Sequence, residues 1–400
     1  MKVKQKYFGK SGTIIFLAMI SAFPPLSTDL YLPALPQLTE YFSTTPSRVN
    51  MTLSFFFIFY ATGLLFWGPL SEKYGRKPIL LAGHGIYIIA SILCAVSQTV
   101  DQLIFFRVLQ AFGGSAVTVI ATASVKDLYA GREREKIMAM VMSMVAIAPM
   151  VAPMIGALLL RITSWQMAFV SLACFGCISG LVSLFYQESL EKKFNGSLLH
   201  SLGRLMVVIK NPGFVSLLGI FSITSVAFMA YLAATSYVYV TYFGLSEQMF
   251  SFFFAFNVLF ATTGPMLYIR VSKRYSASTV VTACFFMLTC CGLALGTFGH
   301  LSPWVFALAV APATLATITM RVPAINLMLD QQEHDAGSVA ALINFAGMLL
   351  GTIGMFLVSL NPSHMIESLG AIQFIVGLIG GGLWLLVRNR PFVLENVHEN

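Results

Sequence analysis

The most constraining feature of this chain is a series of apolar blocks, each about twenty residues long. A helix of about 20 residues is long enough to cross the roughly 30 Å hydrocarbon core of a bilayer. Backbone polar groups in lipid must be hydrogen-bonded within their own segment, so each block is expected to be a helix rather than a strand. The sequence therefore predicts an all-α membrane protein with twelve spans at residues 11–33, 48–68, 79–97, 102–125, 137–160, 166–187, 213–242, 249–270, 279–299, 303–328, 338–360 and 366–388.

The composition supports this class of protein and excludes a soluble domain. Hydrophobic residues make up 57% of the chain and charged residues only 10%, whereas a soluble domain carries about 25% charged residues. The six cysteines all fall inside apolar blocks, so we expect neither a disulfide framework nor a metal site.

The basic residues predict how the spans are oriented. Of the 24 Lys and Arg residues, twenty fall in segments on the same side as the N-terminus, while only Arg48 and Arg161 fall on the opposite side. Cytoplasmic segments of membrane proteins carry such an excess of Lys and Arg. We therefore expect a protein of the bacterial inner membrane with both chain ends on the cytoplasmic side. This bias also accounts for the net charge of +8, and because the basic residues form no single stripe we expect no nucleic-acid partner.

A polar, basic break divides the spans into two sets of six. It predicts an N-terminal half at 1–187, a linker at 188–212 containing an amphipathic helix over 198–210, and a C-terminal half at 213–400. Many transporters consist of two such halves and hold their substrate near the membrane midplane.

Several motifs carry a family resemblance. The segment 68–78 reads GPLSEKYGRKP and resembles the loop signature between the second and third helices of major facilitator transporters. The segments STDLYLPALP at 27–36, RVLQAFG at 107–113 and KDLY at 126–129 resemble the bicyclomycin-resistance (Bcr/CflA) group of drug/proton antiporters. The run APMVAPMIG at 148–156 is similar to the antiporter motif of exporters.

This resemblance implies a major facilitator fold of two pseudo-symmetric six-helix halves that works by alternating access. It also implies two groups of functional residues. The first is a loop latch, in which a loop acid and base tie the halves together, formed by Gly68, Glu72, Gly75, Arg76 and Asp127. The second is the antiporter motif of the fifth span, represented by Pro149, Pro153 and Gly156. Glu72 replaces the usual Asp of the family, and Ala152 and Ala157 stand where Gly is usual.

Two charged residues inside the spans are candidates for proton coupling. An unpaired carboxylate within a membrane costs several kcal/mol, so Asp29 in the first span is expected to take up and release protons. Arg107 in the fourth span is expected at a similar depth, where a contact with Asp29 that forms and breaks would switch proton affinity. The alternatives are a helix-end acid wetted by the outer surface, because Pro33 and Pro36 follow Asp29, and a structural or snorkelling role for Arg107.

The sequence also suggests a substrate cavity, which should be apolar and aromatic with a few polar groups. The candidates are Tyr31, Tyr60, Tyr231, Tyr237, Phe253 and Asn257. Arg321, near the inner end of the tenth span, either snorkels to the lipid headgroups or lines a vestibule that attracts an anionic substrate.

These features predict proton-coupled export of small amphipathic drugs, with a dedicated metabolite exporter as the alternative. The sequence lacks the GxxxxGK[ST] loop of ATP-driven pumps, so an ion gradient is expected to supply the energy. A lipid-modifying membrane enzyme would need a nucleophile–base set that the spans do not offer. We therefore expect a monomeric non-enzyme without cofactors, whose partners are a small-molecule substrate, protons and the bilayer.

Overall fold

Helices account for all the regular structure in the part of the chain that the computed structural model describes, residues 5–190, 198–331 and 336–394. Within these residues, twelve helical stretches are long and apolar enough to cross a membrane, which confirms the predicted number. They are Gly9–Tyr41, Pro46–Tyr74, Arg76–Ala95, Val100–Leu128, Gly131–Ile162, Gln166–Leu184, Pro212–Tyr242, Glu247–Val271, Ala277–Phe298, Pro303–Leu329, Gly337–Ser359 and Pro362–Val387.

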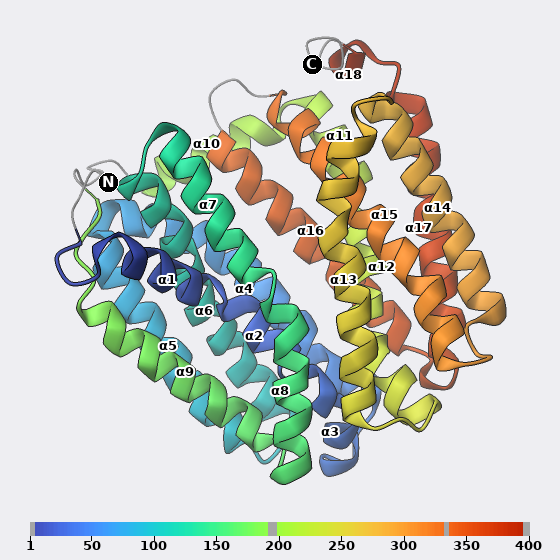
Figure 1. The fold of residues 1–400 in the computed structure, drawn as a ribbon, viewed down its shortest axis with the longest axis horizontal. Coiled ribbons are helices and arrows are strands. Elements are labelled where there is room, and N and C mark those ends of the chain that lie inside the picture. The colour runs from blue at the N-terminus through green and yellow to red at the C-terminus, as the bar shows by residue number, and fades with distance from the viewer. Residues whose placement is uncertain (1–4, 191–197, 332–335, 395–400) are drawn as a thin grey trace. The chain divides into compact units, whose positions relative to one another are not determined.

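The chain divides into two compact units, residues 1–200 and 201–400 (Figure 1). Unit 1 contains α1 (Gly9–Ser21), α2 (Phe23–Asp29), η1 (Leu32–Ala34), α3 (Leu35–Tyr41), α4 (Pro46–Tyr74), α5 (Arg76–Ala95), α6 (Val100–Leu128), α7 (Gly131–Val145), α8 (Ala148–Ile162) and α9 (Gln166–Leu184). Unit 2 contains α11 (Pro212–Ser222), α12 (Thr224–Ser236), η2 (Tyr237–Tyr242), α13 (Glu247–Val271), α14 (Ala277–Phe298), α15 (Pro303–Leu329), α16 (Ala336–Ser359), η3 (Pro362–His364), α17 (Met365–Val387) and α18 (Pro391–Leu394).

The predicted linker contributes a helix to unit 2. The expected amphipathic helix is present as α10 (Leu198–Ile209), with Val208 fully buried and Met206 and Val207 exposed. Residues 191–197 of the predicted linker lie outside the described residues.

The first span is not one continuous helix. It consists of α1, α2, η1 and α3 in succession, and prolines stand at the start of α2, η1 and α3 (Figure 1). Proline has no N–H to donate and suits the first turn of a helix, so each proline begins a new segment. The predicted end of this span at residue 33 was therefore too early, because the helical path continues to Tyr41.

Two other spans are also interrupted. Figure 1 shows α7 and α8 following one another along unit 1. The break between them falls at Ala146 and Ile147, and Pro149 lies at the second position of α8. The seventh span joins α11 to α12 at Ile223 and ends in the π-helical turn η2. Such π-helical turns are rare in proteins, and those that do occur often lie at functional sites.

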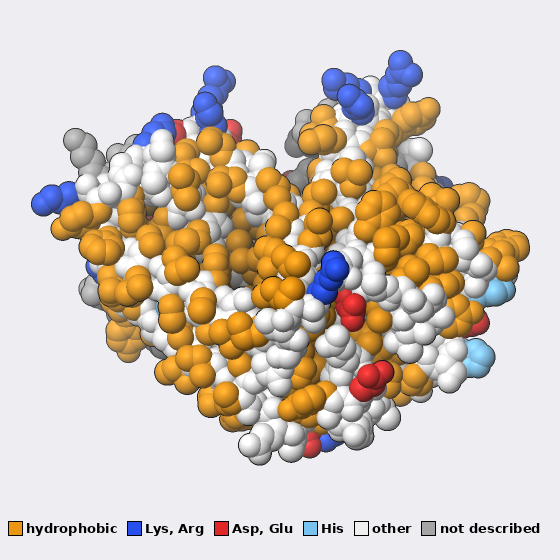
Figure 2. All heavy atoms as spheres, turned by 60° about the horizontal axis from the view of Figure 1, so that its bottom comes forward, with side chains coloured by type: hydrophobic (Ala, Val, Ile, Leu, Met, Phe, Trp, Pro, Cys, Tyr) orange, Lys and Arg blue, Asp and Glu red, His pale blue; other side chains and the backbone are white. Residues whose placement is uncertain are grey.

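The exterior of the molecule matches a lipid environment. Large hydrophobic side chains are exposed on many helices, including Ile89 on α5, Leu181 on α9, Phe286 on α14 and Leu386 on α17. Figure 2 shows hydrophobic side chains over much of the visible face, with most of the visible Lys and Arg side chains near its upper edge. Exposed apolar area of this extent is unfavourable in water and suits contact with lipid tails.

Candidate functional site

Asp29 is the last residue of α2 and lies inside unit 1. Its exposed fraction is only 6%, and its carboxyl Oδ1 accepts a hydrogen bond of 2.9 Å from the hydroxyl of the neighbouring Thr28. The helical path continues beyond it through η1 and α3. The alternative of a helix-end acid wetted at the surface therefore does not match the structure, because the prolines that follow Asp29 restart the helix.

Arg107 on α6 is fully buried beside the end of α2. Its Nη1 donates to the carbonyl oxygen of Ser27 at 2.9 Å and to Oε1 of Gln110 at 2.6 Å. Its guanidinium carbon lies 4.1 Å from the ring centre of Phe56 and 5.1 Å from that of Tyr31. Aromatic faces attract a cation at these distances, so the rings stabilise the buried charge.

The Arg107 site continues as a chain of buried polar groups. Gln110 donates from Nε2 to the hydroxyl of Ser91 at 2.7 Å, and Ser91 donates to the carbonyl oxygen of Tyr87. The Tyr87 hydroxyl in turn lies 2.6 Å from the hydroxyl of Ser27. This chain links α6 and α5 to α2, and it ends two residues before Asp29.

The expected contact between Asp29 and Arg107 is not present in this structure. Arg107 is bonded instead to the carbonyl of Ser27 in the last turn of α2, where carbonyl groups often lack an intrahelical partner. Two further donors of the guanidinium, Nε and Nη2, are buried and have no hydrogen-bond partner within the described part of the chain. The sequence placed both residues at one site, but it did not show that the backbone of α2 competes with Asp29 for the guanidinium.

The antiporter-motif helix packs directly against the segment that carries Asp29. Gly156 of α8 is buried, and a Cβ at this position would overlap the carbonyl oxygen of Leu30. Leu30 also packs with Ala152, and Pro153 is buried in the same helix. Pro149 lies at the second position of α8 and is partly buried. Small residues on α8 thus let it approach the Asp29 segment closely.

A second polar cluster joins the start of α5 to the end of α6. Arg76 donates from Nε to Oδ2 of Asp127 at 2.9 Å, and its Nη1 donates to the hydroxyl of Ser71 at 2.6 Å. The side chains of Arg76 and Asp127 are only 7% and 14% exposed, so this charge-assisted bond is well shielded from water. Ser189 donates a further hydrogen bond to Asp127.

Glu188 is a member of this cluster that the sequence did not suggest. Its carboxylate accepts hydrogen bonds from the backbone N–H groups of Arg76 and Lys77, at 2.9 and 3.1 Å, and so caps the N-terminus of α5. A carboxylate at this end of a helix satisfies unpaired N–H groups and complements the helix dipole. Glu188 is separated from Arg76 by more than a hundred residues, so no local motif could have connected them.

Two members of the expected loop latch do not join this cluster. Glu72 is exposed and forms no ion pair with Arg76, whose acidic partner among the described residues is Asp127. Glu188 lies beside Arg76 as well, but it accepts from the backbone N–H groups of Arg76 and Lys77. The side chain of Glu72 lies on an exposed face of α4, one helical turn before Gly75 and Arg76. A side chain at Gly68 would meet no neighbouring atom, so close packing does not explain that glycine.

The six candidate cavity residues are all buried within their units. Tyr31 bonds through its hydroxyl to Thr52 at 2.9 Å, and Tyr60 stacks on Phe56. Phe253 stacks on Tyr239 with ring centres 4.7 Å apart. Tyr231, Tyr237 and Asn257 are likewise buried, and Tyr231 lines a small cavity in unit 2. Arg321 lines a larger pocket in the same unit, which adjoins this cavity.

Comparison with known proteins identifies the family. The model of the Major Facilitator Superfamily matches residues 15–355. A transporter of this superfamily from Bacillus subtilis (strain 168), YdgK, described as uncharacterized, is 30% identical, over 91% of this chain and 92% of the relative.

Two relatives carry names of drug resistance. A chloramphenicol resistance protein of Pseudomonas aeruginosa is 27% identical over 89% of this chain and 86% of its own length. A bicyclomycin resistance protein homolog of Haemophilus influenzae is 26% identical over 91% and 92%.

Solved transporters share the fold at low sequence identity. A peptide transporter in complex with alafosfalin has a TM-score of 0.77 at 13% identity, covering 98% of this chain and 97% of the other. A D-xylose–proton symporter has a TM-score of 0.70 at 13% identity, covering 92% and 96%. The chain is therefore a multi-pass membrane transporter that belongs to the Major Facilitator Superfamily, and its relatives are consistent with the Bcr/CflA drug-efflux group of that family.

Proposed function

We propose that this protein exports small amphipathic drugs across the bacterial inner membrane in exchange for protons. Asp29 is the observation that carries the proposal, because a carboxyl group buried within a membrane span is costly and usually marks an ion or proton pathway. The family and the drug-resistance names of its relatives support export of drugs as the transported class.

The surroundings of Asp29 suggest how proton binding is coupled to movement. Arg107 lies at the same end of α2 and donates a hydrogen bond to the Ser27 carbonyl. Two of its other donors, Nε and Nη2, have no partner among the described residues. A small displacement of α2 along α6 would exchange the Ser27 carbonyl for the Asp29 carboxylate as the acceptor. That contact favours the ionised acid and releases its proton, whereas its loss favours proton uptake.

The tight contact of α8 with Leu30 offers a route from this exchange to the rest of unit 1. Gly156 leaves no space between α8 and the Leu30 carbonyl, so a shift of the Asp29 segment moves α8 as well. Alternating access then follows when proton binding and substrate binding favour different positions of these helices. The excess of basic residues on one side supports a cytoplasmic position for both chain ends, so that export runs toward the opposite side.

Drug susceptibility of cells that overproduce the protein tests this function. Wild type should raise resistance to one or more amphipathic drugs, and Asp29→Asn should lower it to the level of cells with empty vector at equal membrane abundance. Asp101→Asn is the matched control, because Asp101 is an exposed acid whose surface ion pair with Arg48 contributes about 0–1 kcal/mol. Full resistance in the Asp29→Asn variant would show that this carboxyl is not the coupling group.

A further inference from the structure

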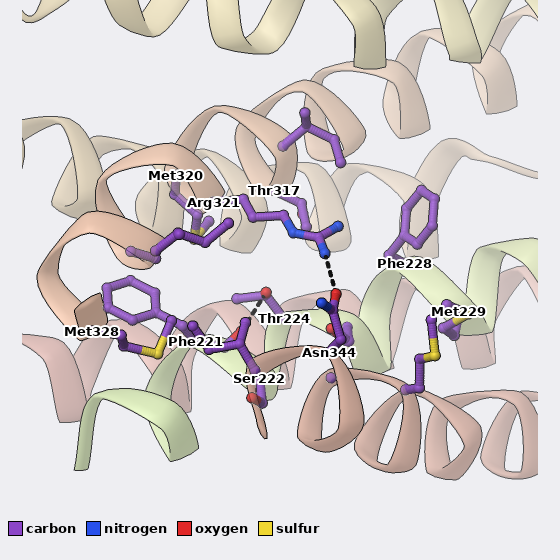
Figure 3. A pocket seen from close by; sticks show the side chains of 17 residues that line it. Phe221, Ser222, Thr224, Phe228, Met229, Thr317, Met320, Arg321, Met328 and Asn344 are labelled. Atoms are coloured by element: carbon purple, nitrogen blue, oxygen red, sulfur yellow. Dashed lines mark hydrogen bonds between the residues drawn. The ribbon is translucent and has the colours of Figure 1, made fainter. Parts of the chain in front are cut away.

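A pocket of about 120 Å³ lies within unit 2, between α11, α12, α15 and α16. Most of its lining is apolar, and Arg321 of α15 is the charged residue among the side chains that line it. Figure 3 shows the Arg321 guanidinium extending toward Asn344 of α16, with Phe228 and Met229 beyond it. The pocket therefore combines one cation with a hydrophobic wall.

The exposed side chain of Arg321 has few protein partners. Among the described residues it forms one hydrogen bond, a long one of 3.4 Å from Nη2 to Oδ1 of Asn344. The Asn344 amide is held in this orientation because its Nδ2 donates to the carbonyl oxygen of Ala340 at 3.0 Å. No acid among the described residues forms an ion pair with Arg321.

An Arg in this state is equipped to bind an oxyanion. The guanidinium has five N–H donors in a planar fork, and Asn344 occupies only one of them. The remaining donors match the two oxygens of a carboxylate or a phosphate group. A charged side chain within a membrane span is costly and is kept where it serves a pathway or a ligand, so a structural role in lipid contact accounts poorly for a pocket-facing Arg.

The walls indicate that the rest of the ligand is apolar and variable in shape. Met229, Met320 and Met328 line the pocket together with Phe228. Methionine side chains are flexible and polarisable, so they adapt to ligands of different outline. The pocket thus fits an amphipathic molecule whose hydrophobic body packs on thioethers and an aromatic ring.

An independent observation shows that the pocket continues away from Arg321. A smaller adjoining cavity shares Phe228 and Thr317 with it and extends to Gln373 of α17. Gln373 is only 2% exposed, and its Oε1 has no hydrogen-bond partner among the residues that the structure describes. A buried acceptor without a donor costs about 1–3 kcal/mol, so this site requires an N–H or O–H group from a ligand or a water molecule.

We propose that Arg321 binds the oxyanion of an amphipathic anion, of the carboxylate or phosphate class, whose apolar body packs against the methionines of this pocket. The part of this proposal that makes the anion a transported substrate rests on the proposed export function. Binding of the anion itself does not depend on proton coupling. The oxyanion belongs either to a soluble amphipathic acid or to the headgroup of an anionic lipid.

Equilibrium binding to purified protein in nanodiscs tests the proposal. The probe is a fluorescent naphthyl-alkyl carboxylic acid, compared at pH 7 with its uncharged primary amide, in nanodiscs of zwitterionic lipid. Wild type should bind the acid at least about tenfold more tightly than the amide, as expected for charge-assisted hydrogen bonds. Arg321→Gln should remove this preference, and Arg321→Lys should keep part of it, because Lys retains the charge without the planar fork.

Controls separate recognition from folding and from transport. Arg270→Gln removes an exposed Arg at the end of α13 and should leave the preference for the acid unchanged. Since binding is measured without a gradient, the preference remains measurable even where proton-coupled export fails. Equal affinity of wild type for acid and amide, or an unchanged preference in a well-folded Arg321→Gln variant, would overturn the proposal.

A second set of nanodiscs identifies the source of the oxyanion. Adding phosphatidylglycerol should leave binding of the acid unchanged if a soluble anion is the natural ligand. If the anionic lipid instead competes with the acid on wild type and not on Arg321→Lys or Arg321→Gln, its headgroup phosphate is the oxyanion that Arg321 binds.

Discussion

Gly75 connects α4 to α5 and is constrained in two ways. Its backbone has φ 109° and ψ 158°, a conformation that is essentially restricted to glycine. A Cβ there would also lie 2.6 Å from the carboxylate of Glu188, which caps α5. The glycine therefore permits both the turn and the cap beside the Arg76–Asp127 ion pair.

Replacing Gly75 by alanine should destabilise unit 1. Backbone strain of this kind costs roughly 1–3 kcal/mol, so Gly75→Ala should lower the thermal unfolding temperature in detergent. Gly68→Ala is the matched control from the same motif, since a Cβ there meets no atom and an alanine within a helix is favoured by about 0.5–1 kcal/mol. An equal or smaller effect of Gly75→Ala would mean that the turn tolerates other residues.

The sequence predicted which residues belong to the candidate site better than it predicted which of them contact one another. It singled out Asp29, Arg107, Arg76 and Asp127, and the structure places the first two at one end of α2 and joins the last two in an ion pair. Glu72 was expected beside Arg76 together with Asp127 because it lies in the motif, whereas the structure brings in Glu188, which caps the backbone N–H groups of Arg76 and Lys77. Choosing between two acids at different ends of the unit requires tertiary packing that no local pattern encodes.

The residues of the candidate site lie near the breaks in the interrupted spans. The break between α2 and η1 follows Asp29, and the break between α7 and α8 precedes the helix that packs on Leu30. A broken helix leaves carbonyl groups without intrahelical partners, and Arg107 binds one of these. The spans were predictable because their length is set by the bilayer, but the exact breaks were not, since Pro312 and Pro323 lie inside the unbroken α15.

Packing of α8 on the Asp29 segment gives a prediction at this scale. Gly156→Ala adds a methyl group that overlaps the Leu30 carbonyl, and overpacking of this kind costs about 1–3 kcal/mol. We expect a lower unfolding temperature and reduced drug export, because α8 must move away from α2.

Gly85→Ala on α5 provides the control, because its added methyl group would meet no neighbouring atom. The two variants should be compared by thermal unfolding and by efflux of a fluorescent substrate from cells at equal abundance. If Gly156→Ala matches wild type in both measurements, close approach of α8 to Leu30 is not required.

For the whole molecule, twelve spans and a membrane class were predictable from block length and charge content alone, because water and lipid impose opposite compositions. The family motifs lie mainly in residues 27–156, and they directed attention to unit 1. The pocket around Arg321 lies in unit 2 and is assembled from four helices, so it became visible only once those helices were packed together.

In the proposed mechanism, substrate moves outward as protons move inward through the carboxyl of Asp29. The most direct test uses proteoliposomes that contain a trapped pH dye and purified protein, to which a drug that the cells resist is added. A membrane potential supplies about 2.3 kcal/mol per charge for each 100 mV, so transport should also respond to ionophores that collapse the proton gradient. We expect drug-evoked proton movement in wild type and none in Asp29→Asn. Drug transport that proceeds without proton movement and is unaffected by ionophores would rule out proton coupling.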